Sequence, residues 1–426
     1  MDHSTTRHWV PNYCHTDNFL PTVQETVILM ANPPYFFPDF VGRAMAFLQS
    51  EAVAKLGFVF DPTSVLPCKW KCSDESLFGV DLALYAFTGQ HPFDKGKLGG
   101  QFNEGAVAAG VHHCKTNIDF GGAHVGYIPG PNGGEFGHIQ RPLNAEELST
   151  DCGALMGIMR PYKEIYDDAC RSILIYRPAG ERILTSIPNE FLEPSWSSHN
   201  IKLLIDVERF CDGLVPYDVN IRHTHKLAGR SLFYVNDEFL LSVSSENLGR
   251  YSTPEKHRIG PELTSPFFHI FDVNPEMEGG VLRHRFLAYM KYILSSKVAP
   301  YPLKAAVTRS NIEYNKLTDC VRAEAFRHYS FASFTGVFID MYDVAKRSYV
   351  NLFQPIGCSL KTADRIREHE FSAAELREAF DGLSPAKPVI PLKGVLGYDN
   401  ADHLIADFTF RPENPTTPTL GQSRRG

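Results

Sequence analysis

The chain is 426 residues long, with 43% hydrophobic and 21% charged residues, the proportions of an ordinary folded protein. A formal net charge of −7 and the lack of a long Lys/Arg block argue against binding of nucleic acid through a basic surface. Residues 1–8 show no signal-peptide pattern, and no run of about 18 apolar residues occurs, so we expect a soluble, cytoplasmic protein outside the membrane.

The first half of the chain alternates strand-like and helix-like segments. Helical periodicity predicts helices over residues 40–56, 74–87 and 144–159. Strands are expected in a short apolar segment that ends at Leu66 and in two glycine-bounded segments, 116–122 and 136–141. Strands that alternate with helices indicate an α/β sheet, in which ligands bind at the carboxyl ends of the strands. The cysteine-rich turn at 67–74 falls at such an end.

The second half has ordinary helical and strand patterning and carries no repeat of the first. Amphipathic helices are expected over residues 200–214 and 284–295. Residues 412–426 are polar and rich in Pro, Thr, Ser and Arg, which is typical of a flexible tail.

Nine cysteines are scattered through the chain, an odd number in a protein too large to need disulfides. We therefore expect thiols, some of them bound to metal. Three segments, 67–75, 120–127 and 148–155, each combine a metal-competent side chain with a strand end or a glycine turn. Two thiolates and one imidazole would leave the fourth position of a tetrahedral Zn²⁺ open, which is the catalytic pattern.

Each of these side chains also has a structural explanation when it is taken alone. Cys72 and Cys152 fit small buried apolar positions, His124 between glycines fits a turn, and Asp74 fits an N-cap of the helix that follows. Only the three segments together, in this order along the chain, indicate a metal site with catalytic chemistry.

That combination resembles the limiting-CO2-inducible protein B/C family, the theta-class carbonic anhydrases, whose fold is similar to that of beta-class carbonic anhydrases. The resemblance covers residues 57–160. It rests on Cys-Ser-Asp-Glu at 72–75, Pro-Phe at 92–93 leading through Gly99 and Gly100 to His112 and His113, Gly-x-His-x-Gly at 122–126, Gly-His-Ile-Gln-Arg-Pro at 137–142 and Ser-x-x-Cys-Gly-Ala at 149–154.

The resemblance implies a zinc-dependent enzyme that interconverts CO₂ and bicarbonate through a zinc-bound hydroxide. Cys72, His124 and Cys152 would be the zinc ligands, and Asp74 would lie beside the metal. The implied fold is a beta-carbonic-anhydrase-like sheet flanked by helices, with a long C-terminal extension or second α+β region. The boundaries expected on this basis are a helical segment at 1–56, the zinc domain at 57–235, an extension of unknown role at 236–411 and the tail at 412–426.

One position departs from the beta-class pattern Cys-x-Asp-x-Arg, because residue 76 is serine rather than arginine. In that class the arginine keeps the aspartate away from the fourth zinc position. Either another cation, with Arg141 as the candidate, restrains Asp74, or Asp74 binds the metal and closes the site. The departure leaves activity open, whereas zinc binding is expected in both cases.

CO₂ is apolar and needs a small dry cleft, and the released proton needs a carrier with a pKa near neutrality. The candidates for the cleft walls are Phe93, Phe102, Val125 and Tyr127. The candidate proton carriers are His112 and His113. Core packing for the aromatic residues and a solvated surface for the histidines are the alternatives.

Two other functions remain open. The same zinc site could hydrolyse a CO₂-like molecule, carbonyl sulfide or carbon disulfide, or the protein could be an inactive, zinc-binding bicarbonate sensor or assembly subunit. We expect a homodimer or a dimer of dimers, because beta-class-like sites are built near a twofold interface.

Overall fold

The structure is a computed structural model. It describes residues 32–130, 134–141, 144–194, 197, 200–216, 229–273, 280–295, 299–363 and 368–398 and the single residues 400, 402, 405 and 408. The expected tail at 412–426 lies outside the described residues. None of the helices in the described part combines the length and the apolar character needed to cross a membrane.

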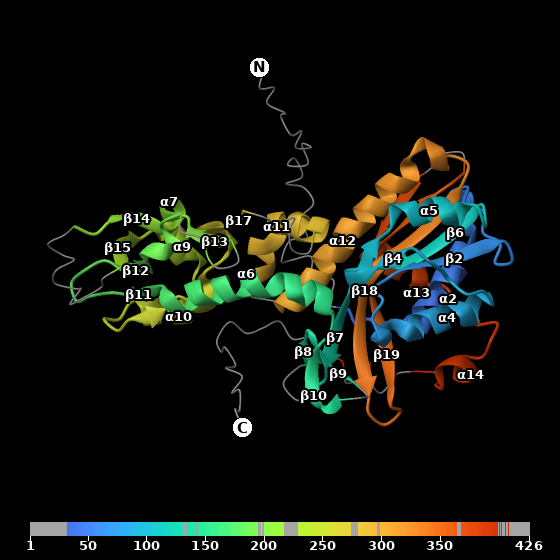
Figure 1. The fold of residues 1–426 in the computed structure, drawn as a ribbon, viewed down its shortest axis with the longest axis horizontal. Coiled ribbons are helices and arrows are strands. Elements are labelled where there is room, and N and C mark those ends of the chain that lie inside the picture. The colour runs from blue at the N-terminus through green and yellow to red at the C-terminus, as the bar shows by residue number, and fades with distance from the viewer. Residues whose placement is uncertain are drawn as a thin grey trace, which may run out of the picture.

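A mixed sheet of nine strands forms the centre of the molecule (Figure 1). Its strands are β1 (Tyr35–Phe36), β2 (Val65–Trp70), β3 (Phe93–Asp94), β6 (Thr116–Gly121), β7 (His124–Ile128), β8 (Glu135–Phe136), β18 (Ser330–Asp343), β19 (Ser348–Lys361) and β20 (Glu368–Ser372). The main path is β1-β19-β18-β6-β2-β3, with β20 beside β19, β7 beside β18 and β8 beside β7. Strands β3, β2, β6 and β18 are parallel to one another, and β19 pairs with β18 as a long antiparallel hairpin. The predicted α/β fold is confirmed.

Helices cover both faces of this sheet. One layer contains α2 (Phe37–Leu48), α4 (Phe78–Thr88) and α13 (Ala373–Asp381), and the other contains α5 (Glu104–Val111) and α12 (Tyr301–Arg322). Side chains alternate between the layers along β18. Phe334 packs on Phe40 of α2 with ring centroids 5.9 Å apart, whereas Phe331 joins a cluster with Leu317 of α12. Helices on both faces explain why β18 is buried along almost its whole length.

A second region, at the left of Figure 1, lies beyond the long helix α6 (Gly153–Ser172). Its five-stranded antiparallel sheet has the order β14-β15-β12-β11-β16, and β13 and β17 form a separate pair. The bounds are β11 (Leu174–Tyr176), β12 (Leu184–Pro188), β13 (Ile201–Ile205), β14 (Cys211–Leu214), β15 (Arg230–Val235), β16 (His257–Arg258) and β17 (Phe268–Asp272). The short helices there are α7 (Val207–Phe210), α9 (Asp237–Ser242) and α10 (Ser245–Tyr251), and α11 (Gly280–Leu294) leads back toward α12.

The structure divides the chain differently from the expected boundaries at 56/57 and 235/236. The central sheet takes β1 from before the first boundary and β18, β19 and β20 from after the second. Residues 57–235 therefore do not form a unit of their own, because the β18–β19 hairpin pairs with β6 and completes the sheet interior. The segment called an extension of unknown role supplies strands to the same sheet that carries the candidate site.

Two predicted helices are wrong in part. Residues 144–159 begin as strand β10 (Asn144–Thr150), which pairs with β9 (His138–Arg141), and α6 begins only at Gly153. Residues 200–214 form β13, α7 and β14 instead of one helix. In β13 the side chains of Ile201, Leu203 and Ile205 are buried, and Asp206 then caps α7 by accepting a hydrogen bond from the Arg209 N–H. The apolar residues of 200–214 fit the spacing of an amphipathic helix, but the first of them also fit the alternate buried positions of a strand.

The remaining predicted elements are present with shifted ends, and the strand expected at 136–141 is divided at Gly137 into β8 and β9. The helix expected at 40–56 is two helices, α2 and α3 (Glu51–Lys55), because Ser50 caps a new start. The helix expected at 74–87 begins as a 3-10 turn, Glu75–Leu77, and continues as α4. The strand expected to end at Leu66 runs on to Trp70. The helix expected at 284–295 is α11, which begins earlier, at Gly280, and ends at Leu294.

Gly122 lies where the chain passes from β6 to β7 in close contact with β18. A Cβ atom at this position would lie 1.8 Å from the carbonyl oxygen of Gly336. We expect Gly122→Ala to lower the free energy of unfolding by about 3 kcal/mol, since the backbones would have to separate. The control is Gly157→Ala in α6, where no atom lies within 4 Å and a gain of about 0.5–1 kcal/mol is expected. Equal effects of the two substitutions in urea denaturation would contradict this account.

Candidate metal centre

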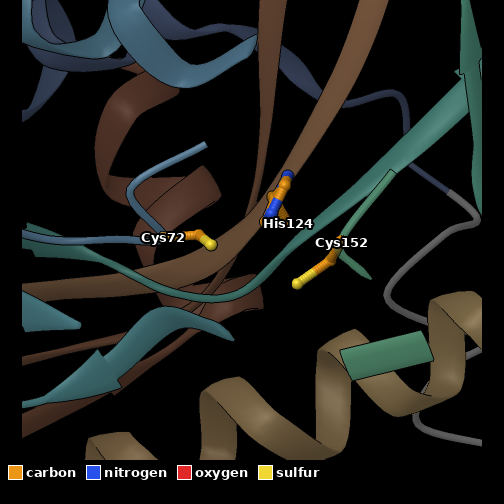
Figure 2. Close-up of side chains that lie close together, drawn as sticks. All are labelled: Cys72, His124 and Cys152. Carbon is orange, nitrogen blue, oxygen red and sulfur yellow. The ribbon is translucent and has the colours of Figure 1, made fainter. Parts of the chain in front are cut away.

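Three side chains meet at the carboxyl ends of β2 and β6. These strands are parallel, with Trp70 opposite Gly121, so the segments that leave them start side by side. Cys72 follows β2 by two residues, His124 opens β7, and Cys152 is the residue before α6. Figure 2 shows the three side chains lying close together.

The donor atoms of this cluster are placed as a metal site requires. One ligand atom each from Cys72, His124 and Cys152 lies within 4.8 Å of the others, and all three side chains are buried. The His124 Nε2 atom is buried and has no hydrogen-bond partner among the described residues. A buried nitrogen left without a partner beside two sulfurs fits the donor set of Zn²⁺. The structure thus brings together the three residues that the resemblance implies as ligands.

The surroundings of Cys72 favour a thiolate. A hydrogen bond from the Cys152 thiol lowers the pKa of Cys72 to about 3 against the opposing effect of burial, and His124 lowers it further. The backbone N–H of Gly99 also donates to the Cys72 Sγ atom, at 3.2 Å. A metal cation would replace the proton that the two sulfurs share.

A carboxylate from the far end of the chain holds the other nitrogen of His124. Asp340 of β18 is fully buried, and its Oδ2 atom lies 2.8 Å from His124 Nδ1. The same oxygen accepts a hydrogen bond from the Ser76 hydroxyl at 2.7 Å, and Oδ1 accepts one from Asn351 Nδ2 at 2.8 Å. A carboxylate that accepts the Nδ1 proton leaves Nε2 as the ring nitrogen that can bind a metal ion. Sequence reasoning missed Asp340, which is 216 residues from His124.

Ser76 accounts for the departure from Cys-x-Asp-x-Arg. Its side chain is completely buried and donates to Asp340, while its N–H donates to Asp74 Oδ1 at 3.0 Å. The residue at this position therefore links the carboxylate beside the cluster to the carboxylate behind His124.

We expect Asp340→Asn to weaken metal binding about 10–100-fold, because any orientation of the amide places an N–H against one of the three donors that now face the carboxylate. The check is zinc affinity measured by chelator competition. Asp119→Asn is the control, since Asp119 is an equally buried carboxylate in β6 that pairs with Lys95 at 2.8 Å. Both variants should lose stability, but only the first should lose affinity. Wild-type affinity in Asp340→Asn would remove this carboxylate from the account.

A second carboxylate lies on the same side of His124. Asp151 Oδ2 is 3.2 Å from His124 Nδ1, and burial raises the pKa of Asp151 to about 6 although His124 lowers it. His124, Asp151 and Asp340 thus form a second group that could hold a cation, on the opposite nitrogen of the same imidazole. Asp151 belongs to a segment that the sequence singled out, but it was given no role.

Arg141 lies against Asp74, as the sequence suggested for the restraining cation. Its two terminal nitrogens lie 3.4 Å from Asp74 Oδ1 and 3.3 Å from Oδ2, and it also pairs with Glu75. Arg141 is itself fixed by the Ser149 hydroxyl at 2.8 Å and by the Asp151 carbonyl oxygen at 3.3 Å. Burial raises the pKa of Asp74, but hydrogen bonds from Arg141 and the Ser76 N–H outweigh it, so the pKa lies below its usual value.

Of the four expected cleft walls, only Val125 borders a space beside the cluster, which is lined also by His124, Gly137, Asp151, Cys152, Leu155, Met156 and Pro302. Tyr127 packs instead on Phe136 and Phe408, with ring centroids 4.9 and 4.7 Å away. Phe102 lies in the core under α5 and α12, and Phe93 packs on the His113 ring. For these three residues, packing explains the position.

The expected proton carriers lie at the opposite end of β6 from the cluster. His112 and His113 are exposed and follow α5, just before β6 begins at Thr116. The six residues of β6 span about 20 Å before the chain reaches the cluster. Proximity along the sequence does not bring these histidines to the site, and the structure gives no support to their predicted role.

The fold and site together define a mixed α/β protein with a buried Cys–His–Cys cluster at the carboxyl ends of two parallel strands of the central sheet. The eight cysteines that the structure describes are all free thiols, as expected. Comparisons with families of known proteins and with curated proteins find no match.

The solved structures to which the chain is similar include two of one group. The crystal structure of PtLCIB4, a homolog of the limiting CO2-inducible protein LCIB, matches at 12% identity and a TM-score of 0.41 over 77% of this chain and 92% of that one. The crystal structure of LCIB itself matches at 13% identity and a TM-score of 0.37 over 80% and 95%. The predicted resemblance to this group is confirmed, and the chemistry is argued below from the residues of the site alone.

Proposed function

We propose that the chain is a zinc-dependent, carbonic-anhydrase-like enzyme that interconverts CO₂ and bicarbonate at the Cys72–His124–Cys152 cluster. The observation that carries the proposal is a three-ligand donor set beside an aspartate held by an arginine. Three protein ligands are the catalytic pattern, because a structural zinc takes four. Zinc bound there would act as a Lewis acid and lower the pKa of a water molecule toward about 7, the chemistry that CO₂ hydration needs.

The residues around the cluster support this use. Asp340 fixes the orientation of His124, so that Nε2 faces the two sulfurs. Arg141 and the Ser76 N–H together occupy both oxygens of Asp74. A carboxylate held in this way accepts a hydrogen bond at the site rather than acting as a further metal ligand.

The residues beside the cluster also bear on the kind of substrate. The space beside the cluster is lined by apolar side chains on one side, Val125, Leu155, Met156 and Pro302, and by polar groups on the other. The apolar part of this lining favours a small apolar electrophile. CO₂ meets this description, as do carbonyl sulfide and carbon disulfide.

Stopped-flow measurement of CO₂ hydration on zinc-loaded, metal-analysed protein tests the proposal. We expect a zinc-dependent rate that rises with pH through the neutral range and that is lost with the metal. Faster release of sulfide from carbonyl sulfide than hydration of CO₂ would favour the hydrolase. Stoichiometric zinc without either activity would favour the bicarbonate sensor or assembly subunit.

We also propose that the chain forms a homodimer or a dimer of dimers. Leu98 and Leu148 are 64% and 56% exposed, and each is next to a residue that contacts Cys72 or Arg141. Phe78 is 60% exposed and follows Ser76, the residue that donates to Asp340, by two positions. Large apolar side chains at such positions are typical of an interface. Sedimentation should give two or four times the chain mass of 47.8 kDa. A single species at the chain mass across micromolar concentrations would contradict this proposal.

A further inference from the structure

Helix α12, from the C-terminal part of the chain, contacts the segments that carry His124 and Cys152 and also the loop that donates a hydrogen bond to Cys72. The Ser310 hydroxyl accepts the N–H of Ala123, the residue before His124, at 2.9 Å. Pro302 lines the space beside His124 and Cys152. Arg309 Nε donates to the carbonyl oxygen of Gly99, at 3.3 Å.

Arg309 acts together with Glu313, one turn further along the helix. Their side chains are 1% and 2% exposed, with Arg309 Nη1 2.8 Å from Glu313 Oε1. The other carboxylate oxygen of Glu313 accepts the Phe102 N–H at 2.6 Å. The ion pair therefore holds the loop 98–102 at both ends, by the carbonyl of Gly99 and the amide of Phe102.

This loop needs to be held. Gly99 and Gly100 have φ angles of 71° and 66°. Because glycine adopts positive and negative φ angles about equally readily, contacts with the rest of the protein must fix this loop conformation. The loop also delivers the hydrogen bond from the Gly99 N–H to Cys72 Sγ. The residue whose carbonyl Arg309 holds is thus the residue whose amide contacts a candidate ligand.

We propose that Arg309, supported by Glu313, is a positioning residue that holds the Gly99 N–H on the Cys72 sulfur. The inference rests on the proposed function in that Cys72 is taken as a zinc ligand. An N–H donor withdraws negative charge from a thiolate, so the sulfur gives less charge to the metal. Two thiolates would otherwise neutralise the dication, and this hydrogen bond preserves part of its Lewis acidity.

The charges around Arg309 agree with this arrangement. Burial lowers the pKa of Arg309 to about 10, while Glu313 and, more weakly, Cys152 favour its charged form. The guanidinium therefore stays charged at neutral pH and interacts electrostatically with Cys152, another candidate ligand.

Arg309→Met is the test variant, and Arg309→Met combined with Glu313→Gln removes the guanidinium together with the charge of its partner. Arg283→Met is the matched control. Arg283 is 4% exposed and pairs with Asp272 at 2.7 Å, away from the loop, so its loss also removes a buried ion pair.

Three readouts follow from the proposal. In metal-free protein, hydrogen exchange at the amides of 98–102 should be faster in both Arg309 variants than in wild type and in Arg283→Met. In the cobalt-loaded protein, the sulfur-to-cobalt charge-transfer band should move to longer wavelength, and cobalt affinity by chelator competition should fall about tenfold. Arg283→Met should lower the melting temperature while leaving all three readouts at wild-type values.

Wild-type exchange and an unmoved charge-transfer band in the double variant would overturn the inference. So would equal changes in Arg283→Met, because the effect would then be general destabilisation. Wild-type protein that binds cobalt but does not hydrate CO₂ would overturn the proposed function and leave this inference standing. If wild type binds no metal, the exchange measurement still decides whether Arg309 holds the loop.

Discussion

Replacing Cys152 with serine is expected to reduce the zinc content from about one ion per chain to nearly none. In zinc-finger peptides, the complete ligand set binds Zn²⁺ with a free energy of about 10–16 kcal/mol, and this binding depends on every ligand. Cys72→Ser and His124→Ala should have the same effect. The reason is that a serine hydroxyl keeps its proton at neutral pH and cannot replace a thiolate as a ligand. Elemental analysis of the purified proteins after dialysis against a weak chelator provides the measurement.

Cys170→Ser is the matched control for the cysteine variants. Cys170 is a buried free cysteine in α6, the helix that begins directly after Cys152, and it is not part of the cluster. Its replacement should cost stability but leave the zinc content at the wild-type level. Equal zinc in Cys152→Ser and in wild type would show that the metal, if any, is bound elsewhere.

The second large effect is expected at Arg141. In Arg141→Ala, Asp74 loses the guanidinium that now lies 3.3–3.4 Å from both of its oxygens, while the three candidate zinc ligands are untouched. A freed carboxylate beside a dication would move toward the open coordination position and close it. We expect CO₂ hydration to fall about 100-fold or more at an unchanged zinc content, the cost of misplacing a group in an active site.

Arg171→Ala is the control, because Arg171 is an exposed arginine that forms an ordinary surface ion pair with Asp168. It should hydrate CO₂ at the wild-type rate. Arg141→Lys should recover part of the activity, since a single ammonium can pair with one oxygen of Asp74 but not with both. Unchanged turnover in Arg141→Ala would remove this residue from the mechanism.

The parts of the site that the sequence could predict are those where chemistry is concentrated in short segments. Cys72, His124 and Cys152 each lie in a segment marked by glycine, cysteine or histidine at the end of an expected strand, and parallel pairing of β2 with β6 brings such ends together. Arg141 could be predicted in the same way, because it lies in Gly-His-Ile-Gln-Arg-Pro at 137–142, one of the segments that carry the family resemblance.

The contacts between distant segments could not be predicted in this way. Asp340 and Arg309 come from a strand and a helix whose patterns look like ordinary core, and only the tertiary fold places them behind His124 and Gly99. The reverse error arose at His112 and His113, which are close to the motifs along the chain but are separated from the cluster by the length of β6. Hydrophobic periodicity reports local structure, and it carries no information on which strand lies beside which.

X-ray absorption at the zinc edge of the loaded wild-type protein tests the central claim most directly, because the structure contains two candidate groups that share His124. The account predicts two sulfur ligands at about 2.3 Å together with nitrogen and oxygen ligands at about 2.0–2.1 Å. A first shell of nitrogen and oxygen atoms alone would place the metal with Asp151 and Asp340 on the other side of the imidazole and would contradict the proposed centre.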